Sequence, residues 1–223
     1  MKLLRSIADL IYPVRCPVCG DFISREEGFC DECRDKLTIW DGSFSVPGAA
    51  DFFAAYEYDE HIRPAVILMK QGICGNAPYA FGNALYKLIA PVLPEFAPDM
   101  IIPVPMHKSS LRRRGCNQAE LVAKELGRAA DIPVRGDIAV KTKKTLEQKL
   151  LSRREREINL RGAFSVIDSA DVRGRNIILL DDVCTTGATL GELTKVLRNS
   201  GAGRVSCVCC CKADVNDDMK GEV

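Results

Sequence analysis

Residues 177–189 read Ile-Ile-Leu-Leu-Asp-Asp-Val-Cys-Thr-Thr-Gly-Ala-Thr, and this segment predicts more of the architecture than any other. The apolar run at 176–180 does not alternate with polar residues, which is typical of a strand covered on both faces of a parallel sheet. Two carboxylates, Asp181 and Asp182, follow the run, and small residues then lead into a helix predicted at 189–199. Ligands bind beyond the carboxyl ends of strands in open α/β sheets, so the segment predicts a binding site there.

The residue types of this segment match a sugar phosphate. Carboxylates accept hydrogen bonds, so Asp181 and Asp182 suit the two neighbouring hydroxyls of a ribose and favour a nearby Mg²⁺ ion. Backbone N–H groups in a loop that opens a helix bind a phosphate dianion, and a glycine lets the backbone approach it closely. A diol and a phosphate on one sugar have the shape of 5-phosphoribosyl-1-pyrophosphate (PRPP). The residues expected to hold the phosphate are Thr185, Thr186, Gly187, Ala188 and Thr189.

The alternative is a plain strand–turn–helix in which Asp residues cap and Thr residues turn the chain. A cap needs only one acidic residue, and two adjacent carboxylates at a strand end repel each other unless a ligand or cation is present. The ligand-binding interpretation is therefore favoured. Within the loop, Cys184 is expected to be a small filler.

The rest of the chain alternates strand-like and helix-like segments from about residue 51, which predicts an α/β fold with a mainly parallel sheet. Further strands are predicted at 100–104 and 205–211, and a helix at 117–130 that Asn117 caps, with Glu120 three residues on. We divide the chain into residues 1–48, an amino-terminal helix with a metal-binding unit, and residues 49–223. A stretch with Gly and Pro at 41–50 is expected to link the two.

Composition is that of an ordinary globular protein. The chain has 223 residues, of which 47% are hydrophobic, and a net charge of +1, so no global field favours nucleic acid or membrane. No segment is long and apolar enough to span a membrane. The first eleven residues resemble an amphipathic helix more than a secretory signal. Because the eleven cysteines are odd in number and no export signal precedes them, a reducing, cytoplasmic location is expected.

Two pairs of cysteines with C-x2-C spacing predict a structural zinc site. Each C-x2-C places two thiolates on one tight turn, and four thiolates fill the tetrahedral coordination of Zn²⁺ without an open position. A short segment that cannot fold by burial alone can fold on a metal instead. Two chance pairs are the less favoured alternative. The expected ligands are Cys16, Cys19, Cys30 and Cys33.

The middle of the chain is basic. Residues 107–161 carry 15 Lys and Arg against 7 Asp and Glu. Three interpretations remain open: cations around a lid that closes over pyrophosphate, a surface for nucleic acid, or a solvated face. The polar stretch 142–161 is the expected lid, whereas His61 and His107 are expected to be non-catalytic.

These pieces, in this order, resemble the ComF family of competence proteins, in which a zinc ribbon precedes a phosphoribosyltransferase domain. The resemblance covers nearly the whole chain, and the sequence departs from the family where Cys116 replaces a usual Phe. Besides the cysteine pairs and residues 177–189, it rests on Ile102-Pro-Val-Pro-Met-His107, on Arg114-Gly-Cys-Asn-Gln-Ala-Glu-Leu121 and on the pattern of Gln148, Leu151, Ser152, Arg156, Asn159, Ala163 and Phe164.

The resemblance implies a type I phosphoribosyltransferase fold, a mostly parallel sheet with flanking helices, preceded by a small zinc ribbon. It implies that the acidic pair holds the ribose hydroxyls and that residues 185–189 hold the 5′-phosphate. Lys70 and Gly72 then fall in a pyrophosphate loop, and Gln148, Arg156 and Asn159 in a flexible catalytic loop.

Two functions remain open on the sequence. The first is a phosphoribosyltransferase that binds Mg²⁺-PRPP and releases pyrophosphate, with an acceptor that the sequence does not identify. The second is a module that senses PRPP, or that binds single-stranded DNA or proteins of the competence machinery through the zinc ribbon and the basic middle. A homodimer is an alternative to a monomer in either case. Some members of the family are tied to DNA uptake.

Overall fold

The computed structural model describes residues 13–24, 26–73, 75–143 and 159–214. A four-stranded sheet in the order β1-β6-β5-β2 forms its centre, and all three strand pairs are parallel. The strands are β1 (Phe52–Glu57), β2 (Met100–Pro103), β5 (Ile177–Cys184) and β6 (Val205–Lys212). The predicted parallel sheet is thus confirmed, with the acidic segment on an inner strand.

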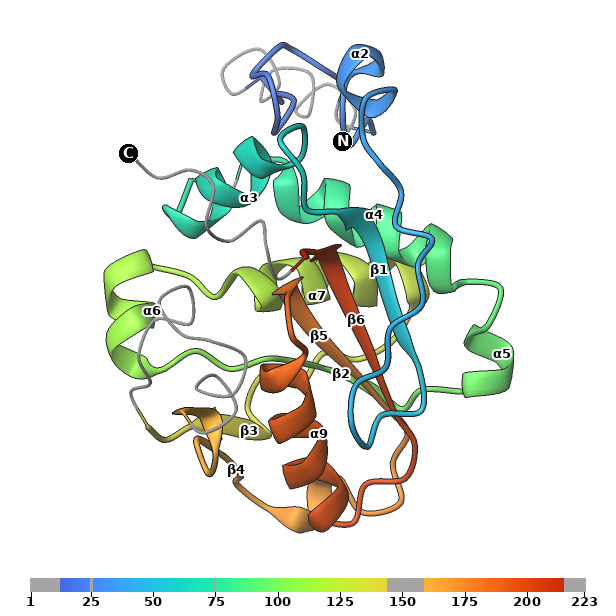
Figure 1. The fold of residues 1–223 in the computed structure, drawn as a ribbon, viewed down its shortest axis with the longest axis vertical. Helices are drawn as coiled ribbons and strands as arrows, with labels where there is room; N and C mark the ends of the chain where they lie inside the picture. Colours follow the sequence, from blue (N-terminus) through green and yellow to red (C-terminus); the bar gives the residue numbers. More distant parts are fainter. Residues whose placement is uncertain (1–12, 25, 74, 144–158, 215–223) are drawn as a thin grey trace, which may run out of the picture.

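Helices cover both faces of this sheet, as Figure 1 shows. One face carries α3 (Arg63–Lys70), α4 (Ala77–Ile89) and α7 (Gln118–Ala130), and the other carries α9 (Ala188–Asn199). A two-stranded antiparallel hairpin, β3 (Ala139–Lys141) and β4 (Phe164–Val166), also lies on the α9 side. Short helical segments complete the described part: α2 (Asp31–Arg34), α5 (Leu93–Phe96), α6 (Lys108–Arg114) and the 3-10 turn η2 (Ser169–Asp171).

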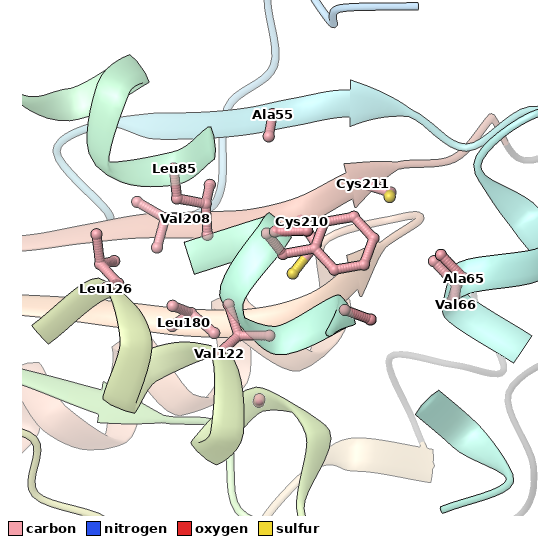
Figure 2. Close-up of a cluster of buried hydrophobic side chains, with 14 of the residues drawn as sticks. Ala55, Ala65, Val66, Leu85, Val122, Leu126, Leu180, Val208, Cys210 and Cys211 are labelled. Carbon is pink, nitrogen blue, oxygen red and sulfur yellow. The ribbon is translucent and has the colours of Figure 1, made fainter. Parts of the chain in front are cut away.

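Apolar side chains from the two central strands fill both cores. On the α4 and α7 side, Leu85 and Leu126 pack with Leu180 and Val208 (Figure 2). On the α9 side, Leu193 and the other buried leucines of α9 pack against the residues of β5 that point toward this helix. Burial on both faces explains why residues 177–180 are uniformly apolar.

The last strand is buried along its whole length. Its four cysteines pack as small apolar residues, as expected from the sequence, and burial raises the pKa of each thiol. They are Cys207, Cys209, Cys210 and Cys211, and all four are fully buried.

Several local details differ from the sequence prediction. Strand β5 continues through the acidic pair to Cys184, and α9 already begins at Ala188. Asn117 precedes α7 but does not cap it, because its side chain donates instead to the Val104 carbonyl, Nδ2 to O 3.0 Å. That bond ties the start of α7 to the end of β2.

Residues 38–50, here called the strap, pack against the sheet and α9. Trp40 N–H donates to the Ala55 carbonyl at 3.3 Å, so the strap first runs beside the edge strand β1. Further on, Val46 is only 4% exposed, and a Cβ on Gly191 of α9 would lie 3.4 Å from the Pro47 ring. The stretch expected to be a linker is therefore part of the packed structure. Within the described ranges, no helix combines the length and apolarity needed to cross a membrane.

Candidate functional site

The acidic pair lies near the carboxyl end of β5, between β6 and β2. Each carboxylate accepts a hydrogen bond from the next backbone N–H: Asp181 Oδ1 from Asp182 at 2.9 Å, and Asp182 Oδ1 from Val183 at 2.8 Å. Both side chains are half-buried. Burial, and then the adjacent Asp182 carboxylate, raise the pKa of Asp181 well above its ordinary value.

Asp181 and Asp182 are neighbours in a strand, so their side chains point toward opposite faces of the sheet, although both carboxylates add to the burial that raises the pKa of Cys210. Burial lowers the pKa of Lys141 in the hairpin, and the Asp181 carboxylate opposes that effect. Asp182 instead adds to the burial that raises the pKa of Cys211, whose neighbours include α3 and α4. Cations or hydroxyl groups of a ligand could therefore meet the pair from either side.

The loop after β5 consists of Thr185–Gly187 and leads directly into α9. Thr186 Oγ1 accepts from Ala188 N–H at 3.4 Å. Gly187 has φ +74°, a conformation that a residue with a Cβ adopts only with strain. A loop of this kind at the amino end of a twelve-residue helix presents backbone N–H groups to an anion.

The strap touches this loop. A Cβ on Gly187 would lie 3.0 Å from Cε1 of Phe44, so the ring packs directly against the glycine. The same ring meets Phe52 of β1 edge-on, with centroids 4.9 Å apart. The loop is thus supported from outside by a residue about 140 positions earlier in the chain, which sequence reasoning did not identify.

Lys212, the last residue of β6, is a second residue that sequence reasoning missed. It pairs in register with Cys184, is 9% exposed, and its Nζ lies 4.7 Å from the centre of the Phe44 ring. The sequence prediction ended this strand at residue 211 because the run of cysteines ends there. Its register with β5, which the sequence does not reveal, is the signal that places Lys212 beside the loop.

Lys70 and Gly72 lie at the end of α3, so the apolar stretch before Lys70 is helical. The Lys70 ammonium opposes the burial that raises the pKa of Cys211, so its charge acts near the carboxyl end of β6. Gly72 has φ +84°, and a Cβ there would lie 2.7 Å from the Arg114 carbonyl oxygen. The turn therefore abuts the end of α6. Its assignment as a pyrophosphate loop stays a prediction.

Of the expected catalytic-loop residues, Gln148 and Arg156 lie outside the described residues, as does most of the predicted lid. Asn159 is described and half-buried, next to the buried Leu160. Strands β3 and β4 flank the segment, which fixes where it enters and leaves the fold. His107 has a structural position, since Ser109 N–H donates to its Nδ1 at 3.2 Å at the start of α6.

The four ribbon cysteines converge, with their Sγ atoms all within 4.8 Å of one another. Cys16 N–H donates to the Asp21 carbonyl at 2.8 Å and Gly20 N–H to the Cys16 carbonyl at 2.9 Å, which folds the first C-x2-C into a tight turn. Burial raises the pKa of the Cys16 thiol, but the backbone N–H groups of Cys19, Cys30 and Val18 outweigh that effect and lower the pKa to about 7. Four close sulfurs fit tetrahedral Zn²⁺.

Two family models match the chain. A model described as a double zinc ribbon domain matches residues 7–44, and one described as a phosphoribosyl transferase domain matches residues 109–221. Despite the word double, residues 7–44 contain four cysteines and no histidine, the ligands of one tetrahedral site.

Among similar proteins, competence protein F of Haemophilus influenzae is 41% identical over 85% of this chain and 81% of its own. The DNA utilization protein YhgH of Escherichia coli K12 is 36% identical, covering 88% and 83% respectively. Competence protein ComFC of Bacillus subtilis is 27% identical, covering 83% and 72%. A solved structure of HGPRT-ase from Leishmania tarentolae with GMP aligns at TM-score 0.32 and 18% identity over 66% of this chain and 72% of that one, a likeness too weak to carry an argument.

Proposed function

The chain belongs to the ComF family, with a phosphoribosyltransferase fold behind a zinc ribbon, and from this premise we propose that it binds PRPP and transfers the phosphoribosyl group with release of pyrophosphate. One observation carries the proposal. Two adjacent carboxylates lie near the carboxyl end of an inner parallel strand, and a short loop with a positive-φ glycine connects that strand to the amino end of a long helix.

This arrangement would hold the sugar at two points. The oxygens of Asp181 and Asp182 would accept hydrogen bonds from the 2- and 3-hydroxyls of the ribose. The loop Thr185–Gly187 and the first turn of α9 would donate N–H groups to the 5′-phosphate. With both ends of the sugar held, the chain would present C1 to an acceptor in a fixed orientation, which is the main contribution a protein makes to such a transfer.

Pyrophosphate would leave toward α3. Lys70 supplies a positive charge near the carboxyl end of the last strand, and the positive-φ turn at Gly72 follows it and abuts the Arg114 carbonyl. Positive charge there would stabilise the departing pyrophosphate as the C1–O bond breaks. The segment between β3 and β4 would exclude water from the site.

The carboxylate donors also fit Mg²⁺. Hard oxygen ligands such as those of Asp181 and Asp182 suit this ion, which keeps several waters and is usually shared with substrate phosphates. When bound with PRPP, Mg²⁺ would neutralise charge on the pyrophosphate. The cytoplasm, where thiols stay reduced, is the location that we infer for the protein.

The first experiment is calorimetric titration of the zinc-loaded protein with PRPP and Mg²⁺. The wild type should bind saturably, and the double variant Asp181→Asn/Asp182→Asn should not, because amides are poorer acceptors and do not attract the cation. Asp41→Asn/Asp214→Asn, which changes the same charge at two exposed residues, is the matched control and should bind like wild type. A well-folded wild type that binds no PRPP would refute the proposal.

A second candidate function is binding of single-stranded DNA, and α6 is the observation that favours it. The last turn of α6 carries Arg112, Arg113 and Arg114, of which the first two are exposed. The similar proteins include one named for competence and one for DNA utilization. Retention on a single-stranded DNA column should fall with rising salt and should be lost in Arg112→Ala/Arg113→Ala. Unchanged retention of the variant would exclude α6 as the contact.

A further inference from the structure

Lys212 is a buried lysine at the phosphate loop. It is 9% exposed, and its neighbour in β5 is Cys184, the residue directly before the loop. Ala213 N–H donates to the Cys184 carbonyl at 2.8 Å, so pairing of the two strands continues past Lys212 and fixes its backbone. The start of the phosphate loop and the start of the Lys212 side chain are therefore held side by side.

The ammonium group has few partners. Its Nζ donates to the Ala213 carbonyl at 2.7 Å and lies 4.7 Å from the centre of the Phe44 ring. Among the described residues, no carboxylate forms an ion pair with it: its cross-strand neighbour Glu57 is exposed and makes no such contact. An ammonium has three N–H donors, so two have no hydrogen-bond partner among the described residues and could bind an anion.

Phe44 connects the lysine to the loop. One ring lies beside both groups: its centre is 4.7 Å from the Lys212 Nζ, and a Cβ on Gly187 would lie 3.0 Å from its Cε1. The charge acts on the loop as well: with a hydrogen bond from Cys209 and the Gly187 N–H, Lys212 lowers the pKa of the Cys184 thiol against the effect of burial. The positive charge therefore acts on the residue directly before the loop that would receive the 5′-phosphate.

A buried charge without a counter-charge destabilises a protein unless something compensates for it. Here the compensating group would be the ligand. We propose that Lys212, supported on the Phe44 ring, is a specificity residue that contributes a direct positive charge to the 5′-phosphate and so selects phosphorylated over unphosphorylated sugars. This inference rests on the proposed function, because it assigns Lys212 to the same site.

The proposal has a signature that a structural role lacks. If Lys212 served to stabilise the fold, Lys212→Met would destabilise the free protein. If Lys212 serves the ligand, Lys212→Met should leave the melting temperature of the free protein unchanged or raised, since methionine keeps the unbranched apolar stem and removes the unpaired charge. Its affinity for ribose 5-phosphate and for Mg²⁺-PRPP should fall about 10- to 100-fold, the loss of one charge-assisted contact.

Three controls sharpen the test. Lys195→Met removes a positive charge from an exposed position of α9 and should bind ribose 5-phosphate like wild type. Mg²⁺-pyrophosphate probes the other end of the substrate, so its affinity should be unchanged in Lys212→Met. Lys212→Arg keeps the charge and should recover part of the affinity for ribose 5-phosphate.

The outcomes separate the two proposals. Wild-type affinity of Lys212→Met for ribose 5-phosphate would overturn the role of Lys212 while leaving PRPP binding intact. Equal loss of pyrophosphate binding, or a lowered melting temperature of the free variant, would also overturn it by showing a structural role. Failure of the wild type to bind either sugar phosphate would refute the proposed function itself, and this inference with it.

Discussion

The carboxyl group of Asp181 is partly removed from water at the end of β5, and burial together with Asp182 raises its pKa. The folded protein therefore holds a proton on this group at pH values where an unfolded Asp, with a pKa of about 3.9, has already lost it. Proton binding stabilises the state that binds more protons, so this group lowers stability as pH rises from about 4 toward the raised pKa. Above that pH the full penalty remains.

We therefore predict that Asp181→Asn stabilises the ligand-free protein at pH 8. The gain should exceed the roughly 0.5 kcal/mol typical of surface substitutions, because the amide needs no dehydration of a charge. At pH 4 the difference from wild type should shrink, since Asp181 is then protonated in the folded state. Urea unfolding at both pH values measures this. An Asp181→Asn protein that is less stable than wild type at pH 8, or a pH-independent difference, would contradict it.

Loss of PRPP binding in Asp181→Asn would show that the residue which lowers stability is needed for the ligand. A residue that destabilises the free protein and is needed for the ligand is expected at a functional site, where stability and activity oppose each other. Asp99, at the other end of the sheet, shows the opposite behaviour: Asn176 N–H, followed by Arg175, lowers the pKa of its carboxyl group. Its contacts are those of a carboxylate that stabilises the fold.

At the level of elements, the junction between β5 and α9 depends on Gly187. The residue combines a left-handed backbone, φ +74°, with close contact to Phe44. Gly174 has nearly the same backbone, φ +71°, but a Cβ there would meet nothing within 4 Å. The two glycines thus separate the conformational effect from the packing effect.

We predict that Gly174→Ala loses about 1–2 kcal/mol of stability, the strain of a left-handed alanine. Gly187→Ala should lose at least about 1 kcal/mol more, because the ring of Phe44 must move. Only Gly187→Ala should also weaken PRPP binding, since the loop moves with the ring. Urea unfolding and calorimetry measure the two effects. Equal stability losses in both variants would show that the Phe44 contact is unimportant.

The junction between β5 and α9 also illustrates which features can be predicted from the sequence. The acidic pair, the loop and the start of a helix are contiguous in the chain, so their residue types and order predict the element sequence directly. Periodicity likewise indicated α7 and the last strand. The assignment of these residues to PRPP remains a prediction, which the titrations above address.

What the sequence did not predict depends on partners far away in the chain. Asn117 has the residue type of a helix cap, but its side chain donates to the Val104 carbonyl, and no local pattern reveals that competing acceptor. Phe44 and Lys212 meet at the loop because the sheet places β1, β6 and β5 side by side. Strand order and register determine such contacts, and local residue patterns predict neither.

Across the whole molecule, the zinc ribbon and the phosphoribosyltransferase fold share one apolar core. Phe29 of the ribbon meets Phe81 of α4 and Tyr56 of β1 edge-on, at centroid distances of 6.0 Å and 5.8 Å. The amide of Asn76 donates to the Glu27 carbonyl at 2.8 Å. A Cβ on Gly28 would lie only 3.1 Å from Ala80 Cα, so the backbones approach closely. Figure 1 shows the ribbon seated beside α3 and α4.

This packing bears on the division of the chain at residue 48, which remains a prediction. If the ribbon were an independent unit, removing its metal would unfold it alone. A metal bound by the four cysteines would hold the ribbon turns together, and the ribbon places Phe29 and Leu37 in the shared core. Loss of the metal should therefore destabilise the sheet and its helices as well as the ribbon.

We predict one zinc per chain, bound by the four ribbon cysteines, and a single unfolding transition in scanning calorimetry. Chelation should lower its midpoint by at least about 10 °C, because the binding free energy of a structural zinc, about 10–16 kcal/mol in zinc-finger peptides, is folding free energy, and 1 kcal/mol shifts a chain of this size by about 2–4 °C. Cys30→Ser should reproduce the shift. Cys116→Ser, outside the cluster, should not. Two transitions, with only the smaller one sensitive to chelator, would instead establish the ribbon as a separately folding domain.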